Sequence, residues 1–218
     1  MPTHISPTRA DHPTLADRAY IELRDRIVSL SLPPGAPLLE DALISDLAVG
    51  RTPIREAIKR LALEDLVTIY PRRGTFVSEI EITDLAQIGD VRLQLEGHAA
   101  YRAAQRATAA DRLEAEALID DLDALRPREE ELMRIDARIH RFVYRCARNP
   151  YLEATLDRLL NLSLRIWLRV IDQLPHLEAS VLEHRELLAA VRDADAKRAR
   201  ALASAHVETF EREIRRVL

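Results

Sequence analysis

The sequence has little glycine, few aromatic residues and a single cysteine. It contains 5 glycines in 218 residues, and aromatic side chains make up 4% of the chain. Scarce glycine together with abundant Ala, Leu, Arg and Glu favours a mostly helical protein. The one cysteine, Cys146, excludes an internal disulfide and fits a reducing compartment.

Long apolar runs and a strong excess of charge are also missing. No apolar stretch approaches the ~20 residues that span a membrane, and the N-terminus lacks the apolar segment of a signal peptide. The net charge of -4 argues against a generally basic nucleic-acid binder. With 47% hydrophobic residues the chain can bury a proper core in one large or two modest domains. We therefore expect a soluble, cytoplasmic protein with no membrane partner.

Between Leu43 and Leu66 the pattern predicts two short helices joined by a tight turn at residues 48–50. Thr52-Pro53 places proline in the opening turn of the second helix, where its missing N–H costs little. The second helix is therefore expected to begin between Gly50 and Thr52. Its apolar positions recur with helical spacing and should face the core: Ile54, Ala57, Ile58, Leu61 and Leu63.

A basic patch and a predicted hairpin accompany this helix pair. Two β-rich runs, residues 67–70 and 75–78, flank the turn Pro71-Arg72-Arg73-Gly74. Arginines at the start of a second helix, followed by such a hairpin, predict a winged helix-turn-helix that enters the DNA major groove. The alternative is an ordinary helical hairpin with a solvated basic face. Six basic residues stand against three acidic ones from Arg51 to Arg73, a local charge of +3: Arg51, Arg55, Lys59, Arg60, Arg72 and Arg73 against Glu56, Glu64 and Asp65.

The run VGRTPIREAIKRLALEDLVTIYPRRGTFV resembles the DNA-binding signature of the GntR family of bacterial transcription regulators, from about Leu38 to Val77. Many members have Ser or Thr at the position of Gly50, and some have a basic residue at that of Asp41. The operator sequence therefore does not follow from the resemblance. The resemblance implies DNA contacts by five residues: Arg51, Thr52 and Arg55 in the recognition helix, and Arg73 and Gly74 in the wing.

Breaks in the helical pattern divide the chain into three parts. Residues 1–13 hold three prolines and predict a flexible tail, residues 14–79 the DNA-binding domain, and residues 80–218 a helical domain. Thr83 is expected to cap the first helix of that domain. Short connections at residues 107–110, 126–127, 149–150, 174–175 and 193–195 predict an antiparallel bundle of about six helices. The fold class is mostly α, with one small β-hairpin.

Four polar side chains interrupt the apolar stripes of this predicted bundle. Asp136 and His140 lie four residues apart on one helix, His184 lies on a later helix, and His206 on the last. A buried polar group is expensive unless it has a partner, and imidazole and carboxylate groups together suit Zn²⁺, Ni²⁺ or Mn²⁺. The periodicity leaves two interpretations open: separately hydrogen-bonded core residues, or a shared divalent metal ion.

The segments DARIHRFVYRCARNPYL and LEHRELLAAVRDADAKRARALASAHVETF are similar to the FCD ligand-binding domain of FadR-like GntR regulators, over about Asp84 to Phe210. The resemblance implies that a divalent metal, Zn²⁺ first, is bound by Asp136, His140, His184 and His206. It further implies a homodimer that senses a small carboxylate effector and releases a pseudo-palindromic operator, as a repressor rather than an activator.

Arg92 is the candidate for a second contact with the effector, because it shares an apolar stripe and a guanidinium binds carboxylate in a bidentate manner. The alternative is a surface arginine paired with Glu96, four residues on. Two other functions stay open for the whole chain. A metalloenzyme could activate water at such a site, although we find no clear general base and expect no enzyme. A metal sensor would respond to metal alone.

Overall fold

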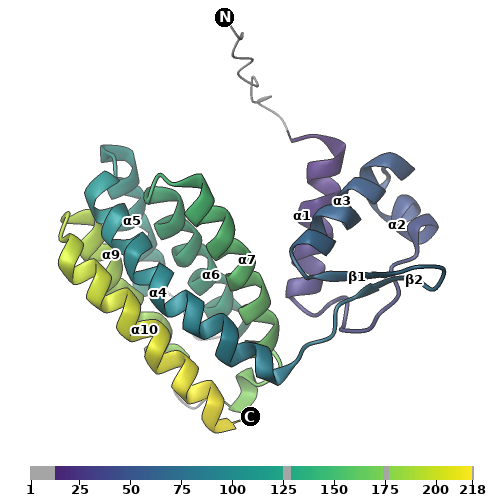
Figure 1. Ribbon diagram of the computed structural model, residues 1–218. Helices are drawn as coiled ribbons and strands as arrows, with labels where there is room; N and C mark the ends of the chain where they lie inside the picture. Colours follow the sequence, from purple (N-terminus) through teal and green to yellow (C-terminus); the bar gives the residue numbers. More distant parts are fainter. Residues whose placement is uncertain (1–12, 125–128, 174–176, 218) are drawn as a thin grey trace, which may run out of the picture. The chain divides into compact units, whose positions relative to one another are not determined.

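The computed structural model describes residues 13–124, 129–173 and 177–217, so most of the predicted tail, residues 1–12, lies outside the described part. The chain forms two compact units, which divide between Glu79 and Ile80. The first unit contains three helices and a hairpin (Figure 1): α1 (Leu15–Val28), α2 (Glu40–Leu47), α3 (Arg51–Leu63), β1 (Val67–Tyr70) and β2 (Gly74–Val77).

Helices α1 and α3 form the core of the first unit. Helix α1 begins with a capping box, in which Thr14 and Asp17 satisfy each other's backbone N–H groups. The prediction that Leu63 faces the core is wrong, because its side chain is 78% exposed. It follows Leu61 by two residues, about 200° around the helix, and therefore lies on the opposite face. The other four predicted positions of α3 are buried: Ile54, Ala57, Ile58 and Leu61.

The turn between α2 and α3 brings the start of α3 to the surface. Ala48 ends α2 in the left-handed conformation at φ 52°, and Gly50 is the N-cap of α3. The helix therefore begins at Arg51, within the predicted window. Gly50 has no side chain that could cap the helix, so the first N–H groups of α3 are free to bind an anion.

The hairpin is an antiparallel pair with Val67 opposite Val77 and Tyr70 opposite Gly74. Its second strand begins at Gly74, where φ is +111°, a conformation that favours glycine. The free edge of β2 is covered by residues 35–38, since the Leu38 N–H donates to the Thr75 carbonyl at 2.8 Å. The hairpin is thus held to the helices as a small wing.

The second unit is all-helical in its described residues. The prediction that Thr83 caps the first helix of this unit is wrong, because that helix starts at Ile82 after Glu81 and no side chain caps it. The predicted helix over residues 177–191 is divided at Glu183. The described residues of the second unit therefore hold seven α-helices and one short 3-10 helix: α4 (Ile82–Arg106), α5 (Ala109–Asp123), α6 (Glu129–Cys146), α7 (Pro150–Trp167), η1 (Ile171–Gln173), α8 (Leu177–Leu182), α9 (His184–Arg192) and α10 (Ala196–Val217).

Helices α4 and α10 run side by side along the second unit (Figure 1). Their close approach depends on two glycines of α4. A Cβ at Gly97 would lie 2.3 Å from Ser204 Oγ, and one at Gly89 would lie 1.9 Å from the Glu211 carboxylate. The predicted breaks at residues 126–127 and 174–175 lie outside the described residues. Within the described ranges, no helix is both long enough and apolar enough to cross a membrane.

Candidate functional site

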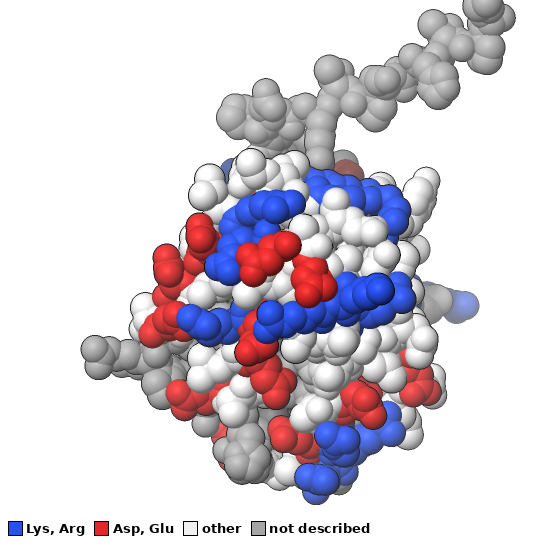
Figure 2. Space-filling model, turned by 90° about the vertical axis from the view of Figure 1, so that its left-hand side faces the viewer, with Lys and Arg blue, Asp and Glu red and all other residues white. Residues whose placement is uncertain are grey.

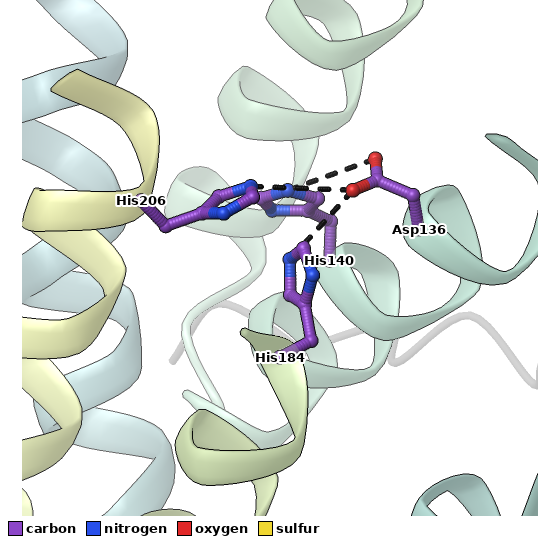
Figure 3. Close-up of side chains that lie close together, drawn as sticks. All are labelled: Asp136, His140, His184 and His206. Carbon is purple, nitrogen blue, oxygen red and sulfur yellow. Dashed lines mark ion pairs between the residues drawn. The ribbon is translucent and has the colours of Figure 1, made fainter. Parts of the chain in front are cut away.

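Asp136 and three histidines converge in the second unit (Figure 3). Helix α6 carries Asp136 and His140 on one face, α9 begins with His184, and α10 carries His206. One ligand atom from each lies within 4.8 Å of all the others. The Nε2 atoms of the histidines lie close to the Asp136 carboxylate, at 3.9 Å for His140, 3.7 Å for His184 and 4.0 Å for His206.

All four side chains are buried, with exposed fractions between 1% for His184 and 7% for His206. The separations from Asp136 are too long for hydrogen bonds. Within the described part of the chain, three buried atoms of the cluster have no hydrogen-bond partner: Asp136 Oδ2, His140 Nε2 and His184 Nε2. An unsatisfied buried polar group costs about 1–3 kcal/mol. The arrangement is therefore unfavourable unless something binds at its centre.

Each histidine uses its other ring nitrogen, Nδ1, away from the centre. His184 Nδ1 lies 3.1 Å from the carbonyl oxygen of Val181, and His206 Nδ1 lies 3.3 Å from Glu183 Oε2. His140 Nδ1 lies 3.2 Å from Glu96 Oε2. These oxygens only accept, so Nδ1 is the donor and, in the neutral ring, Nε2 carries a lone pair. Three lone pairs therefore face the Asp136 carboxylate.

The protonation state of His184 supports this assignment. Burial, together with the neighbouring His206 and His140, lowers the pKa of His184 well below 6.5. Its imidazole is therefore neutral at neutral pH, which is the form that binds a metal. The Nε2 atom that faces Asp136 therefore carries no proton, so His184 does not supply a positive charge to the Asp136 carboxylate.

The donor set fits a divalent metal. Two ligands bound at the ~2.0–2.2 Å typical of zinc lie roughly 3–4 Å apart, and the three separations from Asp136 fall at the upper end of that range. A ligand histidine typically donates its other N–H to a carboxylate or carbonyl, as all three do here. Three imidazoles and one carboxylate suit Zn²⁺, Ni²⁺ or Mn²⁺.

Glu96 of α4 is the centre of a buried polar network beside the cluster. It accepts from Arg92 through Nε at 3.1 Å and Nη2 at 2.7 Å, and from the Tyr144 hydroxyl at 2.5 Å. Burial raises the pKa of Glu96, but the interaction with His140 and the charge of Arg92 outweigh burial and hold that pKa below its usual range. The carboxylate is therefore ionised and can accept from His140.

Arg92 lies beside this network, with 1% of its surface exposed. The alternative of a surface arginine is therefore wrong about its exposure but right about its partner, Glu96. The Arg92 guanidinium also lies 4.9 Å from the ring centroid of Trp167. An effector contact by Arg92 remains a prediction.

A pocket of about 360 Å³ opens next to the cluster. Glu183, His184 and Glu186 line it from the start of α9, while Leu202 and His206 belong to the α10 wall. Two of the candidate ligands therefore reach a cavity large enough for a small molecule. From the sequence, Glu96 was named only as a possible partner of Arg92, and Tyr144 and Glu183 were not named, although the four-residue spacings Arg92–Glu96 and His140–Tyr144 place each pair on one helix face.

The predicted DNA-contacting residues lie at the start of α3 and in the wing. Thr52 is exposed in the first turn of α3, and the side chains of Arg51 and Arg55 are 54% and 57% exposed. In the wing, Arg73 is exposed with its guanidinium 5.6 Å from the centroid of the Tyr70 ring, and Gly74 begins β2.

One member of the basic patch serves the core of the first unit instead. The guanidinium of Arg60 lies 4.0 Å from the centroid of the Tyr20 ring, and its Nη1 donates to Asp17 at 2.7 Å. Arg60 therefore ties α3 to α1.

Figure 2 shows one face of the molecule with charged side chains of both signs. Lys and Arg side chains are interspersed there with Asp and Glu. Two arginines of α9 form ion pairs with neighbouring aspartates. Arg192 pairs with Asp193 at 2.8 Å, and Arg185 pairs with Asp123 at 3.1 Å.

Two protein families match this chain. The family of bacterial regulatory proteins called gntR matches residues 15–77. The FCD domain matches residues 87–209, more than half of the chain, and that range includes all four residues of the buried cluster. A winged helix-turn-helix joined to a helical FCD domain defines a bacterial DNA-binding transcription regulator. The chain belongs to the GntR family and carries an FCD domain, which confirms the predicted family and fold class.

Curated relatives and a solved structure agree with this family and fold. The HTH-type transcriptional repressor GlaR of Escherichia coli is 30% identical, over 87% of this chain and 91% of its own. The galactonate operon transcriptional repressor of the same species is 26% identical, over 92% and 97%. The structure of E. coli McbR/YncC has a TM-score of 0.77 at 20% identity, covering 93% of this chain and 98% of that one, which shows a shared fold. This is a family of transcription regulators rather than enzymes.

Proposed function

We propose that this protein is a homodimeric, cytoplasmic repressor whose affinity for a pseudo-palindromic operator is controlled by a small carboxylate effector. Residues 14–79 bind DNA, and residues 80–218 bind a divalent metal and the effector. Asp136, His140, His184 and His206 hold the metal, with Zn²⁺ the first candidate and Ni²⁺ or Mn²⁺ the alternatives. The repressor assignment follows the names of two relatives, GlaR and the galactonate operon repressor.

One observation carries the sensing half of this proposal. Three Nε2 lone pairs face one buried carboxylate, while each Nδ1 is committed to an oxygen acceptor. Lone pairs and a carboxylate repel one another in a buried site, so a cation must bind between them for the arrangement to be stable. A bound divalent ion supplies that positive charge and a coordination position for an anionic effector.

The pocket beside His184 and His206 is the proposed effector site. A small carboxylate in this pocket would reach the metal from the side that the protein leaves open. Arg92 is the proposed second contact. Its Nε and Nη2 donate to Glu96, so Nη1 is the nitrogen that we propose for the effector contact.

The DNA-binding half rests on the start of α3 and on the wing. Arg51, Thr52 and Arg55 are exposed beside free backbone N–H groups, and such a helix end attracts phosphate. Arg73 and Gly74 would contact DNA from the wing. Two copies related by a two-fold axis would place two recognition helices on paired half-sites, which is why we propose a homodimer.

The decisive experiment measures metal content and induction in the same variant. His184→Ala should lose the metal, as measured by elemental analysis, and should keep operator binding without responding to candidate acids. His98→Ala, an exposed histidine outside the cluster, is the matched control and should behave like the wild type. If His184→Ala retains stoichiometric metal or normal induction, the proposed site is wrong. If metal alone releases DNA from the metal-free wild type, the protein is a metal sensor instead.

A further inference from the structure

Two acidic residues of α2 hold the two arginines at the start of α3. Glu40 and Asp41 form the first turn of α2. Arg55 donates from Nε to both oxygens of Glu40, at 3.0 and 2.9 Å. Arg51 donates from Nη1 to Glu40 at 3.4 Å and from Nη2 to Asp41 at 2.7 Å. Both arginines that are proposed to contact DNA are thus already bound by carboxylates of the same unit.

The two arginines use different nitrogens in these contacts. Glu40 takes only the Nε edge of Arg55, and the described residues provide no partner for its two terminal nitrogens. Those two terminal nitrogens are the pair that can donate end-on to O6 and N7 of guanine in the major groove. Glu40 therefore orients Arg55 without using the donors that a base contact needs.

Arg51 is in the opposite situation, because both of its terminal nitrogens are engaged. Its partner Asp41 is 84% exposed on its side chain, so its charge would face an approaching phosphate. The Asp41 carboxylate takes one of the two hydrogens on Nη2 and lies on the side of Arg51 that DNA would use, so it competes with DNA for this guanidinium. Asp41 thus competes with DNA through a short contact at 2.7 Å, whereas Glu40 reaches Arg51 only at 3.4 Å and binds mainly Arg55.

We propose that Glu40 is a positioning residue that sets base specificity through Arg55, and that Asp41 is a built-in competitor that weakens DNA binding through Arg51. The two neighbouring carboxylates therefore act with opposite sign on the same interface. This inference rests on the proposed DNA contacts of Arg51 and Arg55. It adds a specificity determinant and a limit on affinity that the recognition helix alone does not contain.

The first test is Glu40→Gln, which keeps the size of the side chain but removes its charge. Affinity for a duplex carrying the operator should fall about three- to tenfold, because the guanidinium of Arg55 loses its preferred orientation. Affinity for a scrambled duplex should change less than twofold. Fluorescence anisotropy with both duplexes gives the specificity ratio. A ratio equal to that of the wild type, at an unchanged melting temperature, overturns the role of Glu40.

The second test is Asp41→Asn. Loss of the competing charge should tighten binding to both duplexes about two- to fivefold at low salt, and the gain should shrink as salt screens the interaction. The specificity ratio should stay constant. Unchanged or weaker binding overturns the role of Asp41.

Asp46→Asn is the matched control for both variants. Asp46 lies on the same helix and is also paired with an arginine, but that partner is Arg26 of α1, so DNA binding should not change. Arg55→Ala separates the two levels of the proposal. If Arg55→Ala loses operator binding and Glu40→Gln changes nothing, only the present inference fails. If Arg55→Ala binds normally, the proposed DNA interface itself is wrong.

Discussion

The Nδ1 atom of His140 lies 3.2 Å from Oε2 of Glu96, and this contact joins the buried cluster to helix α4. The other oxygen of the same carboxylate accepts from Arg92 and Tyr144. One residue of α4 therefore orients a candidate metal ligand of α6 and neutralises a buried arginine. An effector that draws Arg92 away from Glu96 would act directly on the partner of His140.

Glu96→Ala should weaken both metal binding and folding. Loss of the acceptor behind a ligand histidine lowers metal affinity about 10- to 100-fold, and an unpaired buried Arg92 costs about 3–5 kcal/mol. Titration calorimetry with Zn²⁺ and urea denaturation measure the two effects. Tyr144→Phe is the control, since it removes one donor but keeps the ion pair, and should cost about 1–2 kcal/mol. Wild-type zinc affinity in Glu96→Ala would contradict the positioning role of Glu96.

Chelation should lower the melting temperature of the wild type. A metal present at 100 times its dissociation constant stabilises the folded state by about 2.7 kcal/mol, and a chelator removes that contribution. His184→Ala should show no change on chelation, because it has no intact site to empty. Differential scanning calorimetry with and without chelator measures the shift, with His98→Ala as the control. A wild-type melting temperature that is insensitive to chelation speaks against a bound metal.

Arg51→Ala should lose about 1–3 kcal/mol of operator affinity while zinc binding stays unchanged. Arg73→Ala in the wing should instead weaken binding to all duplexes and reduce the salt dependence by about one phosphate contact. Anisotropy titrations over a series of salt concentrations distinguish the two behaviours. Arg18→Ala, an exposed arginine of α1, is the matched control. Equal losses for Arg18→Ala and Arg51→Ala would show that only net charge matters.

Glu211 of α10 should make stability depend on pH. Burial raises its pKa above 4.5, opposed by Arg92 and Arg215 and assisted by Asp90. Because the folded-state pKa is raised, the unfolded chain loses this proton first. The folded protein is therefore penalised as pH rises from about 4.5 through the raised pKa. Glu211→Gln removes the penalty, so its melting temperature should exceed that of the wild type at pH 7.

The difference in melting temperature between Glu211→Gln and the wild type should disappear below the usual pKa range of glutamate. There the Glu211 carboxyl is protonated in both the folded and the unfolded state. Thermal melts in matched buffers from acidic to neutral pH test this. Glu208→Gln, an exposed glutamate on the same helix, is the control and should show no such trend. A constant difference across the series would mean that packing, rather than ionisation, separates the two proteins.

Much of the fold and of the buried cluster could be predicted from the sequence. The spacing of Asp136 and His140 placed them on one helix face, and His184 and His206 fell on core-facing positions, where they are buried. The prediction was wrong for Leu63, whose two-residue spacing from Leu61 already places it on the opposite helix face, and for the continuity of the helix across Glu183. Leu63 lies at the end of α3 and faces outward. The break at Glu183, which lets His184 begin a new helix, has no proline or glycine to mark it.

The amino-acid sequence by itself determined the family, the order of helices and wing, and the four candidate ligands, because motifs and periodicity depend on residues that are close along the chain. Only the tertiary structure decided what surrounds them. Glu96 meets His140 across 44 residues, and Glu40 meets Arg55 across 15. Such partners depend on how helices pack, since burial and pairing follow from distances in space that no local pattern contains.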